Sequence, residues 1–179
     1  MTQTGKNIIL LMGESGSGKT TLSRLLQIQH GWHDISSYTT RPPRYAGEPG
    51  HIFITDKEFD QINSEDMCAF TTFNGYRYCA TCAQADNADI YVIDPAGVIA
   101  FKDRYKNRRN PITIYLKTSM KCRYDRMLSR GDSHDAVMSR LKHDETAFKT
   151  AQDIADYTLD GEDDPQILAD KIFKIAGNV

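Results

Sequence analysis

The segment IILLMGESGSGKTT, residues 8–21, constrains the fold more than any other part of the chain. It joins an apolar run at residues 7–12 to a glycine-rich turn and the start of a helix. An uninterrupted apolar run of this length is typical of a strand that is buried on both faces of a sheet. The pattern G-x-x-x-x-G-K-[ST], which marks a phosphate-binding loop, is met by Gly13, Gly18, Lys19 and Thr20.

The chemistry of such a loop indicates a nucleotide polyphosphate as the ligand. Successive backbone N–H groups form a concave anion site, and the positive end of the following helix adds to it. We expect Lys19 to reach the β- and γ-phosphates of ATP, the phosphoryl donor, and the Thr20 hydroxyl to bind Mg²⁺. The residues expected to bind ATP are Gly13, Glu14, Ser15, Gly16, Ser17, Gly18, Lys19, Thr20 and Thr21.

The length and charge of the chain limit the classes of protein to which it can belong. A chain of 179 residues can form one domain with a substantial core. Its 22 basic and 24 acidic residues argue against a generic nucleic-acid binder. The polar N-terminus is unlike a signal peptide, and no apolar stretch approaches the ~20 residues that span a bilayer. With its four cysteines, which are expected to be ordinary reduced residues, the sequence predicts a cytoplasmic protein without a membrane partner.

Strand and helix patterns alternate along most of the chain, which predicts an α/β fold with a mostly parallel sheet. Residues 36–83 break this alternation and read as a small β-rich insertion, with an Asn-Gly turn between two of its strands. Asp56 is expected to cap a short helix there, and Gly31 is expected to end the first helix. Helices are predicted at 20–29, 119–129, 134–152 and 165–176, and strands at 7–12, 33–38, 51–54, 67–73, 76–79, 88–94, 111–116 and 157–161.

A second loop, SSYTTRPPRYAGE, carries two arginines at positions 41 and 44 with two prolines between them. A guanidinium group can bind two phosphate oxygens at once, and the prolines reduce the entropy lost when the loop becomes ordered. Taken alone, the loop could be a solvated basic turn. Its two arginines are also candidates to bind a second phosphate group.

The order of motifs resembles the guanylate kinase family over essentially the whole chain. The phosphate loop is followed by S-x-T-T-R-x-x-R, by the hairpin F-N-G-Y-R-Y, by V-I-D at a strand end and by R-x-x-x-R-G. The resemblance implies a three-layer phosphate-loop kinase core, formed by residues 1–35 and 84–179, with a helical lid at about 119–145. Residues 36–83 would form the acceptor-binding subdomain of the same folding unit. The implied reaction moves the γ-phosphate of ATP to GMP or dGMP, so nucleotides would be the small-molecule partners of a monomer or homodimer.

The resemblance also implies roles for individual residues. Those that fall on acceptor-binding positions are Ser37, Arg41, Arg44, His51, Tyr78 and Asp94. The residues that would act on the transferring phosphoryl group are Lys19 and the lid arginines Arg126, Arg130 and Arg140. Arginines in this role stabilise the charge of the transition state.

Several positions depart from the family pattern, and most of them concern the base of the acceptor. The glutamate that reads guanine in the family is replaced by Ala69, and a serine is replaced by Ala80. Other departures are His51, Arg77, Cys79 and Val92. Unpaired guanine donors cost roughly 1–3 kcal/mol each. The sequence therefore supports phosphoryl transfer better than it supports GMP as the acceptor.

Two alternatives remain open at the level of sequence. Ribose bisphosphate phosphokinases also resemble the chain in the L-M-G-x-S-G-S-G-K start and in an H-I strand, and they lack the same glutamate; Arg44 and Asp94 favour the guanylate kinase prediction. A catalytically silent guanylate-kinase-like module that binds proteins is the other alternative. The complete phosphate loop, with Lys19 and Thr20, argues against it.

Overall fold

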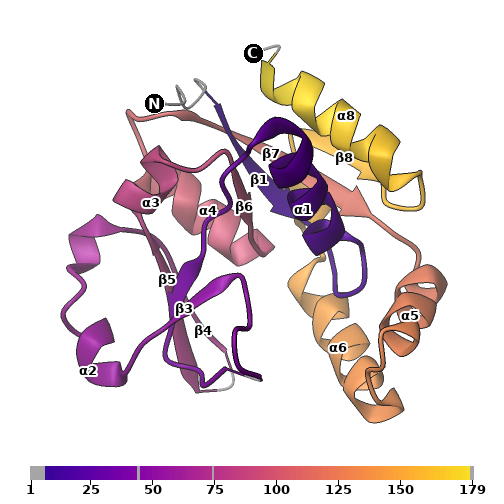
Figure 1. The fold of residues 1–179 in the computed structure, drawn as a ribbon, viewed down its shortest axis with the longest axis horizontal. Helices are drawn as coiled ribbons and strands as arrows, with labels where there is room; N and C mark the ends of the chain where they lie inside the picture. Colours follow the sequence, from indigo (N-terminus) through magenta and orange to yellow (C-terminus); the bar gives the residue numbers. More distant parts are fainter. Residues whose placement is uncertain (1–6, 44, 74, 178–179) are drawn as a thin grey trace.

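The computed structural model describes residues 7–43, 45–73 and 75–177, and it contains two four-stranded sheets (Figure 1). The first has the order β6-β1-β7-β8, and each neighbouring pair is parallel. Its strands are β1 (Asn7–Met12), β6 (Ile90–Val92), β7 (Asn110–Lys117) and β8 (Tyr157–Asp160). This confirms the predicted α/β fold with a parallel sheet.

The central strand β1 explains why helices cover both faces of this sheet. Ile8, Leu10 and Met12 belong to one buried cluster, whereas Ile9 and Leu11 belong to another. The first cluster includes Phe101 of helix α4 (Pro95–Arg104), and the second includes side chains of α1 (Lys19–His30) and α8 (Pro165–Gly177). Because successive side chains of a strand point to opposite faces, β1 joins both clusters in a three-layer core.

The second sheet is formed by the predicted β-rich segment and has the order β3-β2-β5-β4. Its strands are β2 (Ser37–Thr39), β3 (His51–Phe53), β4 (Met67–Phe73) and β5 (Tyr76–Thr81). The pair β4–β5 is the antiparallel hairpin that the Asn-Gly signal predicts, with Thr71 opposite Tyr78. The short elements α2 (Asp56–Phe59), η1 (Ser64–Asp66) and α3 (Cys82–Asp86) complete this part of the chain.

Helices α5 (Met120–Ser129) and α6 (His134–Ala147), to the lower right of Figure 1, lie in the segment that the sequence predicts to be a lid, and we call them the lid helices. They pack together through a small cluster of buried Met127, Val137 and Leu141. The second sheet lies to the lower left of the same view, and the loop between β1 and α1 lies just above α6.

Three sequence predictions about local structure are wrong. The predicted strand 33–38 is reduced to an isolated bridge at Asp34 followed by β2, which begins at Ser37. The predicted helix 134–152 is interrupted between α6 and α7 (Ala151–Ile154). The cap of α2 is Thr55 rather than Asp56, because the Thr55 hydroxyl accepts the Glu58 N–H and Glu58 bonds back to Thr55.

In the described part of the chain, no helix has both the length and the apolar character needed to cross a membrane.

Candidate active site

The phosphate loop adopts a backbone that requires glycine at two positions. Gly16 has φ +78° and Gly18 has φ +107°, both in the left-handed region that side chains disfavour. A Cβ atom on Gly16 would lie 2.7 Å from the carbonyl oxygen of Arg123 on α5. The loop therefore bends sharply and packs directly against the lid region.

Helix α1 presents an uncapped N-terminus to the site. Gly18 supplies no side-chain cap, and Leu22 donates to the Gly18 carbonyl oxygen at 3.1 Å. The N–H groups before Leu22 have no partner within the helix, and the first turn carries no acidic residue. Such a helix start attracts anions through its N–H groups and its positive dipole end.

Lys19 is the first residue of α1, and its ammonium group reaches back to the loop, where it donates to the carbonyl oxygens of Gly13 at 2.5 Å and Glu14 at 3.0 Å. Burial lowers the pKa of Lys19 to about 8, while the carboxylates of Asp144 and Glu14 oppose that shift. A bound polyphosphate would provide further negative charge beside this ammonium group.

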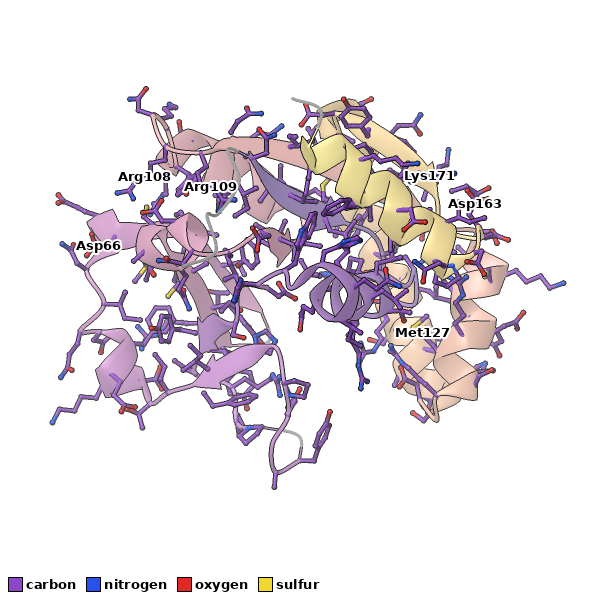
Figure 2. All side chains as sticks on the ribbon, turned by 45° about the horizontal axis from the view of Figure 1, so that its top comes forward. Asp66, Arg108, Arg109, Met127, Asp163 and Lys171 are labelled. Carbon is purple, nitrogen blue, oxygen red and sulfur yellow. The ribbon has the colours of Figure 1, made fainter. Side chains whose placement is uncertain are left out.

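A cleft of about 910 Å³ adjoins the loop. The residues from Ser15 to Thr21 line it, together with Tyr45, Glu48 and Pro49 from the loop that connects β2 to β3. It is also lined by Asp163, which forms an ion pair at 2.8 Å with Lys171 of α8 (Figure 2). The cleft thus lies between the nucleotide-binding loop, the lid and the second sheet.

The three predicted lid arginines all line this cleft. Arg126 donates to the carbonyl oxygens of Ser17 and Gly161, at 3.0 Å in each case. Arg130 and Arg140 both lie near Asp132, at 2.6 and 3.9 Å. Asp132 thereby holds two guanidinium groups beside the loop, a role that the sequence analysis did not assign.

A smaller cavity of about 150 Å³ lies between the second sheet and the end of β6. It brings together four predicted acceptor-binding residues, namely Ser37, His51, Tyr78 and Asp94. The Ser37 hydroxyl lies 3.0 Å from Nδ1 of His51. The Asp94 carboxylate accepts the Gly97 N–H at 2.6 Å as the cap of α4. Ala69 lines the same cavity, at the position where the family pattern has glutamate.

Arg41 connects the two cavities. Its guanidinium group makes two hydrogen bonds to Glu48, at 2.9 and 3.1 Å, and Glu48 lines the larger cleft. It also interacts with Tyr78, which lines the smaller cavity. The pKa of Arg41 is raised by Glu48, so this cation stays charged between the two spaces.

Some of the predicted site residues line neither cavity. Gly13 and Glu14 lie behind the lining of the cleft; the Glu14 carboxylate accepts the Tyr115 hydroxyl at 2.9 Å. Arg44 lies outside the described residues. The sequence analysis did not assign roles to Glu48, Asp132 and Asp144, although Glu48 stands in the G-E pair that follows the arginine loop.

The family comparison agrees with this geometry. A family model described as an AAA domain matches residues 9–146, which include the phosphate loop, the second sheet and the lid helices. The chain belongs to the AAA domain family. Within that AAA domain, the match ends close to the end of α6.

Curated relatives of this AAA domain protein are guanylate kinases. The enzyme of Helicobacter pylori is 29% identical over 171 residues, which cover 88% of this chain and 80% of the relative. The enzyme of Clostridium acetobutylicum is 29% identical over 161 residues, with 84% and 74% covered. The enzyme of Fusobacterium nucleatum is 26% identical over 148 residues, with 76% and 78% covered. These relatives confirm the predicted relationship to the guanylate kinase family.

A solved structure has the same fold. The crystal structure of guanylate kinase from Anaplasma phagocytophilum aligns with a TM-score of 0.61 at 18% identity, over 98% of this chain and 86% of that chain. At this identity the similarity establishes the fold.

Proposed function

We propose that this protein transfers the γ-phosphoryl group of ATP to a nucleoside monophosphate, with GMP or dGMP as the foremost acceptor. The observation that carries the proposal is the position of Arg41 between the two cavities, where it contacts Glu48 on one side and Tyr78 on the other. A phosphate held at that point would lie between a base pocket and the phosphate-loop cleft. The guanylate kinase relatives support this assignment.

The chemistry requires positioning and charge stabilisation more than covalent participation by the protein. The first-turn N–H groups of α1 and the Lys19 ammonium group would hold the donor phosphates. Arg126, Arg130 and Arg140 would neutralise charge that develops on the transferring group. The acceptor phosphate is already largely ionised at neutral pH, so no general base is needed. Closure of the lid would exclude water and prevent hydrolysis of ATP.

The residues fit a magnesium ion that is bound together with the nucleotide. The Thr20 side chain lies in the cleft beside Lys19 and offers a hydroxyl oxygen. The described residues contain no group of three His, Cys, Asp or Glu side chains that could hold a metal by themselves. Mg²⁺ commonly takes substrate phosphates and water as its other ligands. The ion would supply charge neutralisation between the donor phosphates, with Thr20 as its ligand from the protein.

Recognition of the acceptor base would depend on the smaller cavity. Without a glutamate at position 69, the remaining polar groups include Ser37, His51, Thr71 and Asp94. Ser37 and Asp94 are the candidates to pair with guanine donors, and His51 is already oriented toward Ser37. We therefore expect GMP or dGMP to bind more weakly than it would with a buried carboxylate at position 69.

The kinase assignment is favoured over the two alternatives because the curated relatives are guanylate kinases. The assembly as a monomer or homodimer and the cytoplasmic location stay predictions, as does the division into a core, an acceptor-binding subdomain at residues 36–83 and a lid.

A coupled assay of ADP release, with ATP and Mg²⁺, tests the function directly. The acceptor panel is GMP, dGMP, AMP, CMP, UMP, dTMP and ribose bisphosphate. We expect the fastest turnover with GMP or dGMP, and loss of turnover in Lys19→Ala. Turnover with ribose bisphosphate alone would overturn the nucleotide assignment. Binding of ATP without turnover on any acceptor would contradict the kinase function.

A further inference from the structure

A buried ion pair connects the two lid helices. Asp144 of α6 and Arg123 of α5 are only 4% and 6% exposed, and their Oδ2 and Nη1 atoms lie 3.5 Å apart. Neither residue lines the cleft, and the phosphoryl transfer described above uses neither of them. Apolar residues in place of a buried ion pair are often equally or more stabilising, so stability alone does not account for this pair.

The pair also holds the phosphate loop. The same Oδ2 atom of Asp144 accepts the backbone N–H of Ser15 at 2.8 Å. Arg123 donates through Nε to the Thr118 carbonyl oxygen at 3.3 Å, and the Thr118 hydroxyl donates to the Ser17 carbonyl oxygen at 3.4 Å. The carboxylate of Asp144 is therefore shared between a lid cation and the loop backbone.

A close backbone contact lies at Gly16, between the bond to Ser15 and the bond to Ser17. The Arg123 carbonyl oxygen approaches Gly16 so closely that a Cβ there would be 2.7 Å away, and Met127 of α5 lies on the same side (Figure 2). Three consecutive loop residues, from Ser15 to Ser17, are thus held by the two lid helices. The N–H groups that follow, at the start of α1, are those expected to bind phosphate.

We propose that Asp144 is a positioning residue for the donor nucleotide, because its carboxylate fixes the phosphate loop to the lid through Ser15 and Arg123. Movement of the lid would then change the shape of the loop, and a nucleotide in the loop would favour one position of the lid. Asp144 also faces Lys19, together with Glu14 of the loop, Arg123 of α5 and Arg130 at the end of α5, and it opposes the lowering of the Lys19 pKa that burial causes. The inference rests on the loop being the site for ATP, and it does not depend on the identity of the acceptor.

The test compares ATP affinity with stability in matched variants. Asp144→Ala removes the acceptor of the Ser15 N–H and leaves Arg123 as an unpaired buried cation. The double variant Arg123→Leu/Asp144→Ala removes both charges, and apolar replacement of a buried ion pair often leaves stability unchanged. Glu145→Gln removes the exposed carboxylate of the next residue on α6 and serves as the control. Dissociation constants for ATP with Mg²⁺ are measured by calorimetry, and unfolding by denaturant.

We expect Asp144→Ala to weaken ATP binding about tenfold or more, as the loss of a charge-assisted hydrogen bond implies. The double variant should unfold close to the wild-type midpoint but should keep the weakened ATP binding, whereas Glu145→Gln should match the wild type in both measurements. Asp144→Asn should have an ATP affinity between those of the wild type and Asp144→Ala, because its amide oxygen still accepts the Ser15 N–H without the charge.

Two outcomes would overturn the proposal. Recovery of wild-type ATP affinity in the double variant would show that Asp144 acts only through stability. Wild-type ATP affinity in Asp144→Ala would show that the bond to Ser15 does not position the loop. Because these readouts involve the donor alone, they are independent of whether GMP, another acceptor or no acceptor is phosphorylated.

Discussion

Asp34 shows how one residue can make stability depend on pH. Its Oδ2 atom accepts the Ser23 hydroxyl at 2.6 Å, and its buried Oδ1 atom has no hydrogen-bond partner. Burial raises the pKa of Asp34 to about 6, while the Ser23 hydroxyl and the nearby backbone of Ile35 and Val92 oppose the shift. The folded state therefore holds an extra proton between about pH 4 and 6, and stability from this group is lost as the pH rises through 6.

The replacement Asp34→Asn should stabilise the protein at pH 8 by about 1–2 kcal/mol and should have little effect at pH 4. The asparagine still accepts the Ser23 hydroxyl but carries no charge at either pH. Denaturant unfolding at both pH values measures the effect, with the exposed Asp135→Asn as the control. An equal gain at pH 4 would show that the charge of Asp34 is not the cause.

At position 69 the chain offers a direct test of base recognition. Ala69 is 4% exposed and lines the smaller cavity, opposite Ala80 in the hairpin register. Ala69→Glu should lower the KM for GMP about tenfold, because a carboxylate would accept hydrogen bonds from guanine. Ala69→Gln has nearly the same size without the charge and should give a smaller effect. Steady-state kinetics with GMP and AMP measure this, and an equal change for AMP would contradict guanine reading.

At the scale of elements, the contact between the phosphate loop and α5 joins the donor site to the lid helices. Gly16 and Gly31 have similar backbone angles, with φ +78° and +67°, but only Gly16 has a neighbouring backbone atom within reach of a Cβ. Gly31 ends α1 in open space. Alanine substitutions at these two positions can therefore distinguish the effect of backbone strain from the effect of a collision with α5.

Gly16→Ala should abolish measurable ATP binding, since the methyl group would displace either the loop or α5. Gly31→Ala should cost about 1 kcal/mol of stability from the left-handed backbone alone and should leave ATP affinity unchanged. Calorimetric titration with ATP and Mg²⁺, together with unfolding midpoints, gives both quantities. ATP binding by Gly16→Ala at wild-type affinity would contradict the close packing of loop and lid.

At the scale of the whole molecule, charges from the loop and from both lid helices set the protonation of Lys19. Its lowered pKa of about 8 is caused first by burial, with Asp144 and Glu14 raising it and with Arg130 and Arg123 lowering it. A polyphosphate adds negative charge beside the ammonium group and should raise the pKa again. Binding of ATP should therefore take up about half a proton at pH 8, more at pH 9 and little at pH 7.

Calorimetry of ATP binding in buffers of different ionisation enthalpy measures this proton uptake. Lys19→Arg serves as the control, because a guanidinium group stays charged throughout this range and should take up none. Equal proton uptake by Lys19→Arg would assign the effect to another group. No uptake at pH 9 in the wild type would contradict a lowered pKa for Lys19 in the free protein.

The sequence by itself determined the parts of this protein that depend on local pattern. The apolar run before Gly13, the glycines of the loop and the Asn-Gly hairpin identified β1, the phosphate loop and the β4–β5 pair, because burial and backbone geometry act there through neighbouring residues. The motif order also indicated the family, the phosphate-loop residues and the three arginines of the larger cleft, and four residues of the smaller cavity. The split of the predicted helix 134–152 escaped this reasoning, since its apolar and polar pattern continues through the break.

Only the tertiary structure decided which charges meet. Arg41 and Glu48 lie seven residues apart on a loop, while Asp144 reaches Ser15 across 129 positions of the chain and pairs with Arg123 from another helix. In the sequence, Asp144 is one acidic residue among several on a polar helix. Its burial, and with it the link between the lid helices and the phosphate loop, arises because α5 packs against Gly16 and α6 reaches Ser15. A contact between distant segments leaves no periodic signal in the chain.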